Sequence, residues 1–257
     1  MSIFKSILFI SIFIAYSFQA KSQDNYEIQV YGSSTMDKGK TMVELHSNFA
    51  INGNNEKVDG VVPSHHALHE TIEITHGFNQ WFEVGFYLFN AVTPSQGIDF
   101  AGSHIRPRVR VPDEWNLPVG LSLSTEFGYM RPLYSEDSWQ LEIRPIIDKT
   151  FFGKLYVCYN PVLDKSLKGM NQNETFVFSS NFKIGYKMTN KIIPGIEYYG
   201  SHGPLNRFDE FQKQQQQIVP CIDLNLSPDW EFNFGAIFGV TDATDKFLLK
   251  MIIGRKF

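Results

Sequence analysis

Arginine stands at every second position in the segment "HIRPRVR" (residues 104–110), so an extended strand would carry Arg106, Arg108 and Arg110 on one face. Opposite charges on neighbouring strands form cross-strand ion pairs, and charges in a narrow interior are costly unless they are paired. We therefore predict an ion-pair ladder, which either forms a constriction that selects solutes by size and charge or fills a narrow barrel. The other candidate lumen residues are Glu44, His46, Glu73, Glu83, Glu126, Glu142 and Arg144.

Two further groups of side chains could carry chemistry of another kind. His65, His66 and His69 lie close together in the sequence, but a metal site needs ligands that converge on one point, and the first two end a long loop. His46 and Ser47 suggest part of a hydrolase triad, yet adjacent strand residues point to opposite faces, and no nucleophile elbow is present. We expect no catalytic residue, no metal and no cofactor.

The elements that would position the charged rows are strands, because apolar residues recur at every second position along most of the chain. Residues 82–88 place four apolar side chains on one face, and residues 247–257 do the same except at Arg255. About twelve such segments, each near the length of a tilted membrane strand, predict an all-β fold: a transmembrane antiparallel β-barrel. Proline falls on the apolar face of several segments, where we expect bulges or lapses in pairing. These prolines are Pro107, Pro145, Pro161, Pro194 and Pro220.

Period-two alternation leaves open which face is inside, and three further features decide it. Residues 1–22 have the features of a secretory signal peptide, with Lys5 before a short apolar run and small residues at the expected cleavage site. Short turns such as 187–190 alternate with longer polar segments such as 51–67, 90–102 and 200–216, as in outer-membrane barrels. Aromatic residues stand near strand ends, where an interfacial girdle belongs. They include Trp81, Tyr129, Trp139, Tyr186 and Trp230.

Composition and order along the chain set the remaining expectations. The net charge of -4 argues against a nucleic-acid partner. The two cysteines, Cys158 and Cys221, fall on strands that are not neighbours, so we expect two free thiols. The predicted order is a signal peptide over 1–22, a short periplasmic lead over 23–40 and a barrel over 41–257.

Five segments carry a resemblance to a known family. The chain resembles the Gram-negative outer-membrane barrels grouped as MetA-pathway phenol-degradation outer-membrane proteins, over nearly all of its length after residue 22. The resemblance implies a barrel with an outer-membrane address. The segments are "GKTMVELHSNF" (39–49), "HETIEITHGFNQWFEVGFYLF" (69–89), "HIRPRVRVP" (104–112), "LEIRPIIDK" (141–149) and "LSPDWEFNFG" (226–235).

The expected function is that of a porin-like channel, not an enzyme, for passive uptake or efflux of small solutes across the outer membrane of a Gram-negative bacterium. Two alternatives stay open: a plugged barrel whose extracellular loops bind a partner, and a membrane-embedded lipid-modifying enzyme. The expected partners are outer-membrane lipids, small solutes and the barrel-assembly machinery. That machinery would engage the C-terminal strand, since a terminal aromatic such as Phe257 resembles its recognition signal.

Overall fold

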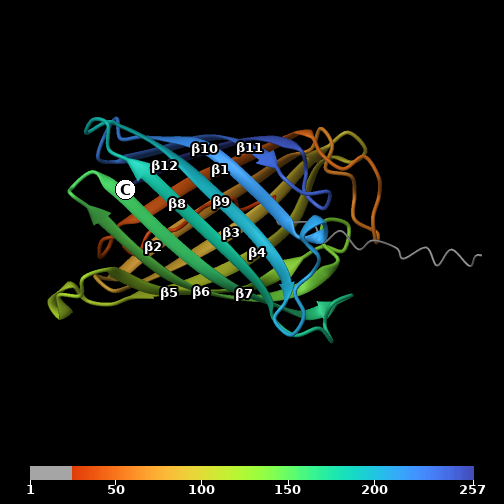
Figure 1. Ribbon diagram of the computed structural model, residues 1–257, viewed down its shortest axis with the longest axis horizontal. Helices are drawn as coiled ribbons and strands as arrows, with labels where there is room; N and C mark the ends of the chain where they lie inside the picture. Colours follow the sequence, from red (N-terminus) through yellow and green to blue (C-terminus); the bar gives the residue numbers. More distant parts are fainter. Residues whose placement is uncertain (1–24) are drawn as a thin grey trace, which may run out of the picture.

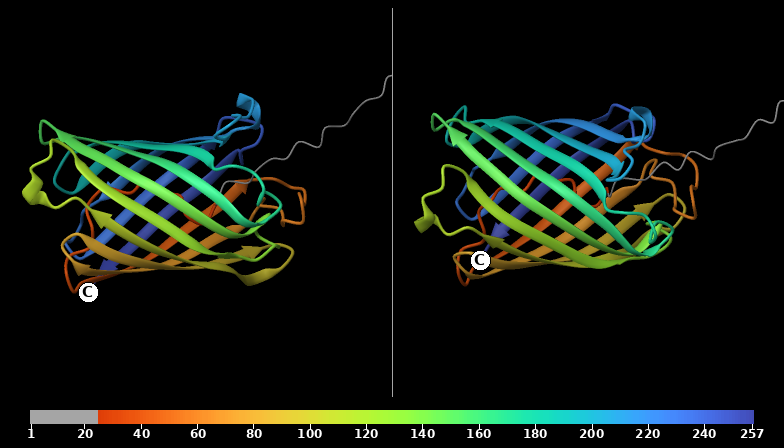
Figure 2. Two further views of the ribbon diagram at one scale, coloured as in Figure 1. Left: turned by 90° about the horizontal axis from the view of Figure 1, so that it is seen from below. Right: turned by 60° about the horizontal axis from the view of Figure 1, so that its bottom comes forward.

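The computed structural model describes residues 25–257, so the signal peptide expected over 1–22 lies outside the described residues. In the described range, each strand pairs antiparallel with its sequence neighbours, and β1 pairs with β12 to close a barrel (Figure 1). The strands run obliquely around the barrel (Figure 2), and no helix in this range is long and apolar enough to cross a bilayer. The strands are β1 (Thr41–Asn52), β2 (Leu68–Asn79), β3 (Phe82–Thr93), β4 (Gly97–Arg110), β5 (Gly120–Met130), β6 (Asp137–Phe151), β7 (Leu155–Gly169), β8 (Val177–Tyr186), β9 (Ile192–Pro204), β10 (Gln215–Leu224), β11 (Trp230–Gly239) and β12 (Phe247–Lys256), with short 3-10 helices η1 (Asp113–Trp115) and η2 (Phe211–Lys213).

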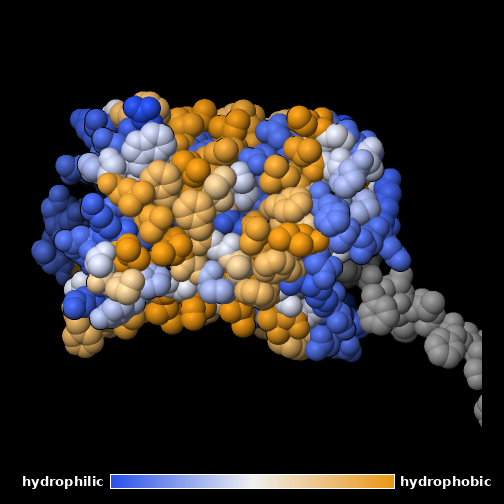
Figure 3. Space-filling model, turned by 90° about the horizontal axis from the view of Figure 1, so that it is seen from above, coloured by the Kyte–Doolittle hydropathy of each residue, from blue (hydrophilic) through white to orange (hydrophobic). Residues whose placement is uncertain are grey.

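Along the strands, apolar side chains point out of the barrel and polar side chains point into it, as the alternation predicts. In β1, Val43 and Leu45 are exposed on the outside, whereas Glu44 and His46 are buried inside. Apolar residues form a belt around the middle of the barrel, and hydrophilic residues gather at both ends (Figure 3). The prediction that the apolar face points outward and the polar face lines the lumen is therefore confirmed.

The two rims differ in their connections, though less than the sequence predicts. The prediction of a long loop over 90–102 is wrong, because β3 and β4 extend into this range and leave only residues 94–96 as a turn. Val92 pairs with Ile98 there, and Gly97 adopts a φ of 70° that allows the chain to reverse sharply. The connections are 80–81, 111–119, 152–154, 187–191 and 225–229 at the short-turn rim, and 53–67, 94–96, 131–136, 170–176, 205–214 and 240–246 at the long-loop rim.

Strand pairing lapses beside the prolines, as expected from their missing N–H group. The β4–β5 pairing is interrupted at Pro107, and the β10–β11 pairing is interrupted at Pro220. Between β6 and β7 the pairing stops around Pro145 and Pro161, which lie on facing stretches of the two strands. Pro194 lies just beyond the end of the β8–β9 pairing. The prolines therefore interrupt the ladder locally without opening the barrel.

Residues 25–36, which we call the inner segment, run through the lumen from the long-loop rim to the short-turn rim. At the first rim the Asn25 side chain donates to Asp245, at 2.9 Å, and at the second the Met36 N–H donates to Glu83, at 2.5 Å. The division into signal peptide, lead and barrel stays a prediction, but the stretch 25–36 of the periplasmic lead expected over 23–40 lies inside the barrel. The physical reason is that its side chains and backbone find partners on the luminal wall, whereas residues 37–40 are exposed at the rim where β1 begins.

The inner segment has its own two-residue alternation, which matches two different parts of the wall. Ile28 and Val30 pack into an apolar cluster that includes Val219, Ile237 and Leu248 from β10, β11 and β12. Burial of side chains of this size is worth about 1.5–3 kcal/mol each. Apolar docking therefore holds one face of the segment, and its other face meets the charged wall described below.

Aromatic residues stand at both rims, and one contact there explains the odd residue of the C-terminal strand. Arg255 points outward, with its guanidinium carbon 5.3 Å from the ring centre of Trp230 and 4.9 Å from that of Phe257. A guanidinium over two aromatic faces gains cation–π attraction. Arg255 thus interrupts the apolar face only at the short-turn rim, where the chain ends (Figure 1).

Candidate functional site

The predicted arginine row forms a buried ion-pair cluster on β2, β3 and β4. Arg106 contacts Glu73 at 2.6 Å and Glu83 at 3.1 Å, and Arg108 contacts Glu83 at 2.7 Å. The strand register explains this arrangement: Glu83 pairs with Arg108, and Arg106 pairs with Gly85. Because Gly85 has no side chain, Arg106 extends across β3 toward β2, with its guanidinium 3.1 Å from where a Cβ of Gly85 would stand. We call Glu73, Glu83, Arg106 and Arg108 the arginine cluster.

The inner segment covers the arginine cluster from inside the lumen. The ring centre of Tyr31 lies 4.8 Å from the guanidinium carbon of Arg106 and 4.9 Å from that of Arg144. Arg108 donates hydrogen bonds to two backbone carbonyl oxygens of the segment, at Gly32 (3.1 Å) and Ser34 (2.7 Å). The guanidiniums are therefore shared between carboxylates of the wall and groups of the inner segment, so charged contacts join the two parts across the lumen.

The remaining predicted residues fall into four groups outside this cluster, one of which adjoins Glu73. Glu126 forms an ion contact with His104 across β4 and β5, and Glu142 makes two contacts of 2.7 Å with Arg144 on the same strand. Arg110 does not join the ladder, because β4 ends there and its side chain pairs with Asp113 at the short-turn rim. Glu44 and His46 lie beside Glu73, with His46 Nε2 3.4 Å from Glu73 Oε2.

A second buried charged cluster was missed by sequence reasoning. Glu197 contacts Lys250 at 2.5 Å and Lys183 at 3.1 Å, and Lys183 also contacts Asp223 at 2.9 Å. The Tyr199 hydroxyl donates to Glu197 as well, at 2.8 Å. We call Lys183, Glu197, Asp223 and Lys250 the lysine cluster. The available signal was alternation, since each of these residues stands between apolar neighbours in its strand, but Lys250 on β12 lies far in the sequence from the other three, which stand on β8, β9 and β10.

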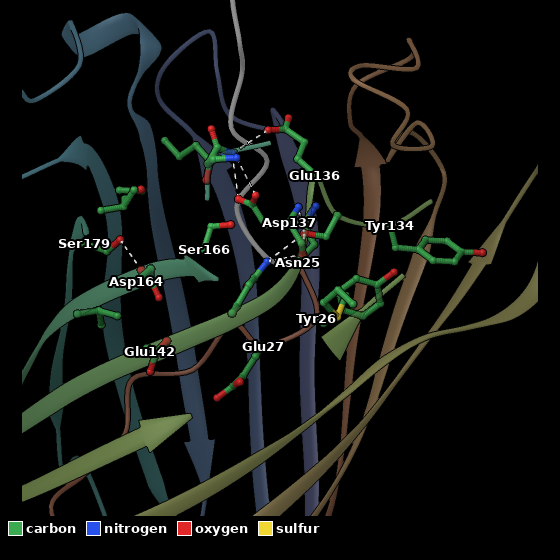
Figure 4. A pocket seen from close by; sticks show the side chains of 18 of the residues that line it. Asn25, Tyr26, Glu27, Tyr134, Glu136, Asp137, Glu142, Asp164, Ser166 and Ser179 are labelled. Carbon is green, nitrogen blue, oxygen red and sulfur yellow. Dashed lines mark hydrogen bonds between the residues drawn. The ribbon is translucent and has the colours of Figure 1, made fainter. Parts of the chain in front are cut away.

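A pocket of about 260 Å³ lies at the long-loop rim, lined by side chains of the inner segment, of the rim loops and of several strands (Figure 4). Its lining is rich in carboxylates, which outnumber the basic groups Arg144 and Lys165. Outside the strands, burial and a hydrogen bond to Asp99 raise the pKa of Tyr134 to about 12, so this hydroxyl stays neutral at physiological pH. We call this pocket the acidic vestibule. Its acidic residues are Glu27, Glu136, Asp137, Glu142, Asp164 and Glu174.

The other candidate groups do not assemble into sites. His69 points into the lumen against Tyr26, whereas His66 stacks with Phe49 on the outer side, and the described residues contain no metal-ligating group built from the three neighbouring histidines. Ser47 points outward and donates to Glu70, at 2.9 Å, so it cannot meet His46. Both cysteines are buried free thiols, as predicted.

Comparison with known proteins extends the fold assignment. No family model matches the chain, and no curated protein matches it, so the narrower resemblance to MetA-pathway proteins stays a prediction. The barrel is similar to the KdgM porin, with a TM-score of 0.57, 9% identity, 84% of this chain and 99% of that chain covered. It is similar to an outer membrane channel from Pseudomonas putida F1, with a TM-score of 0.59, 9% identity, 90% of this chain and 100% of that chain covered. It is also similar to the NanC porin, with a TM-score of 0.56, 8% identity, 84% of this chain and 98% of that chain covered. At these identities the likeness establishes the barrel fold.

Proposed function

We propose that this protein is a porin-like channel of the outer membrane of a Gram-negative bacterium, through which small solutes pass by diffusion. The observation that carries the proposal is the lumen: a closed barrel with an apolar outer belt holds two buried ion-pair clusters and an acidic vestibule inside. The likeness to barrels described as porins and channels supports it. In this proposal the chain acts without catalysis, and outer-membrane lipids surround the apolar belt.

Export and insertion follow from the two ends of the chain in the same proposal. A signal peptide over 1–22 would direct the chain out of the cytoplasm and be removed. The barrel-assembly machinery would then recognise β12, whose outer face is apolar and which closes the barrel against β1. Short turns in the periplasm and longer loops outside the cell would be the usual orientation of such a barrel.

The constriction is the arginine cluster together with the inner segment. Charged side chains that line a narrow passage select solutes by size and by sign. Because the acidic vestibule precedes the constriction, cations would be concentrated at its entrance. We therefore assign a preference for small cationic or neutral solutes.

Planar-bilayer recording of the refolded protein tests this function. Arg108→Ala should change the size or the ion preference of single-channel steps, because it removes a charge that lies between Glu83 and the inner segment. Arg110→Ala is the matched control, since it removes the same residue type from the same strand at the rim, and it should leave the steps unchanged. An unboiled sample that migrates as a folded barrel but gives no steps would contradict the channel and support a plugged barrel, and hydrolysis of added lipid would support the enzyme alternative.

A further inference from the structure

Three buried side chains converge on one point of the luminal wall at the β1–β2 pair. Glu44 stands directly opposite Glu73 in the strand register, and His46 lies one inward position further along β1. One donor atom from each of the three lies within 4.8 Å of the other two. Exposure of the three residues is 7%, 0% and 1%, so bulk water does not separate them.

The polar atoms in this group lack the partners that buried groups normally have. His46 Nδ1 has no hydrogen-bond partner, and His46 Nε2 meets Glu73 Oε2 only in a long contact of 3.4 Å. The other oxygen of Glu73 is occupied by Arg106, at 2.6 Å, and by the Thr75 hydroxyl, at 2.6 Å. A buried imidazole nitrogen without a partner is rare in proteins, and it calls for an explanation.

The carboxylates at this point of the wall also lack one compensating positive charge. Two carboxylates placed directly opposite each other on neighbouring strands repel. Arg106 compensates Glu73, and Arg108 compensates Glu83, but Glu44 makes no ion pair with any described residue. Exposed Glu231 adds to the negative charge, since it flanks Gly254, the partner of Glu44 across the β1–β12 pair. A divalent cation between Glu44, His46 and Glu73 would remove both the repulsion and the unpaired atoms.

We propose that Glu44, His46 and Glu73 form a binding site for a divalent transition-metal ion, with Zn²⁺ as the best match. One imidazole nitrogen and two carboxylate oxygens are a usual three-ligand set for Zn²⁺, with a water molecule in the fourth position. Ca²⁺ and Mg²⁺ prefer oxygen ligands alone, which disfavours them at His46. Arg106 then serves as an outer partner that orients Glu73, the role such groups commonly play around metal ligands.

An ion can reach this site from the short-turn rim. Gly254 has no side chain, and a Cβ placed there would come within 2.8 Å of Glu44 Cγ and 3.4 Å of Glu231 Cβ. The glycine therefore leaves room for Glu44 and the exposed Glu231 on its two sides, and these two carboxylates would draw a cation inward. The site does not depend on whether the barrel conducts, so its test is separate from that of the channel.

Zinc binding by the refolded full barrel in detergent tests the site. After dialysis against a chelator, the protein is titrated with ZnCl₂ by calorimetry and in competition with a chromophoric zinc indicator. We expect one ion per chain, and His46→Gln should weaken binding by more than about 100-fold, the upper range for loss of a mere outer partner. His202→Gln is the control, since this histidine bonds Gln214 far from the site and should leave binding unchanged.

Two outcomes would overturn the proposal. One is the absence of saturable zinc binding by a barrel that migrates as folded without boiling. The other is binding that His46→Gln leaves intact and that a His65→Gln/His66→Gln variant removes, which would place the ion in the 53–67 loop. If His46→Gln does not fold, the nearly isosteric Glu44→Gln carries the same test, and Co²⁺ absorption in the visible range reports whether the ion keeps its nitrogen ligand.

Discussion

The lysine cluster offers the sharpest test of how the lumen is held together, because one carboxylate there serves two ammonium groups. Glu197→Gln leaves Lys250 fully buried with neutral partners alone, the new amide group and the Tyr199 hydroxyl, at 3.3 Å. Lys183 keeps Asp223 at 2.9 Å. The variant therefore creates one uncompensated buried charge, and replacing that lysine as well, in Glu197→Gln/Lys250→Met, removes it.

The structure gives a magnitude for each member of this double-mutant cycle. Loss of one partner from a buried ion pair costs about 3–5 kcal/mol, which is our expectation for Glu197→Gln. Lys250→Met alone leaves Glu197 bonded to Lys183 and Tyr199, so it should cost about 1.5–3 kcal/mol, the worth of a hydrogen bond to a charged group. If the two losses were independent, they would add; instead we expect the double variant to be about 3 kcal/mol more stable than additivity predicts, at the upper end for residues in contact.

Urea unfolding of the barrel in lipid vesicles measures the cycle, with tryptophan fluorescence and the folded band on unboiled gels as two probes. With a slope of roughly 3 kcal/mol per molar urea, a coupling of this size separates the observed and additive midpoints by about 1 M. Coincident unfolding and refolding curves establish that the free energies of unfolding are at equilibrium. A double variant whose midpoint equals the additive value would refute the idea that Glu197 and Lys250 depend on each other.

Two further predictions follow from the inner segment and from the packing of the wall. Tyr31→Ala should enlarge single-channel steps in planar bilayers, because it removes the ring that covers the guanidiniums, whereas Tyr31→Phe keeps the ring and should change them less; equal steps in both variants would argue against the ring as an obstruction. Gly128→Ala should lower the free energy of unfolding by roughly 1–3 kcal/mol, because a methyl group there collides with the ring of His104 and must displace it. Gly185→Ala meets only a methyl group of Ile193, at 3.2 Å, and should cost less; the reverse order would show that this wall is loosely packed.

Much of the barrel could be predicted from the sequence, because strand alternation and hairpin order are local. Strands that follow each other in the chain are neighbours in such a barrel, so Glu83 could be placed beside the arginine row without a structure. Arg110 lies outside the arginine cluster for a local reason: the alternation continues to the end of the strand, but the lumen does not, and the side chain turns to Asp113. The two-residue alternation of a strand shows which face a residue occupies. It does not show where along the strand the interior of the barrel ends.

Lys183 and Glu197 pair across the β8–β9 hairpin. The contact of Glu197 with Lys250 and the contacts of the inner segment are not local, so they could not be predicted in this way. Lys250 and Glu197 are 53 residues apart and lie on strands that are not adjacent in the barrel. Their contact depends on the curvature that brings inward side chains together across the lumen. The inner segment has alternating residues like a strand but pairs with none, so its place inside the barrel depends on the shape of the space that the other strands enclose.

The inner segment also decides what kind of channel this barrel can be. Ile28 and Val30 fill the apolar side of the lumen, and Tyr31 lies against the charged side. In the proposed channel, a lumen packed on both sides would leave solutes to pass beside the segment, which suits ions and small solutes. Larger solutes would require the segment to leave, and its departure would expose Arg106, Arg108 and Arg144 at once. Solute size and the charge that the solute meets are therefore coupled through one element, so enlarging the passage with Tyr31→Ala should shift ion preference in the same recording.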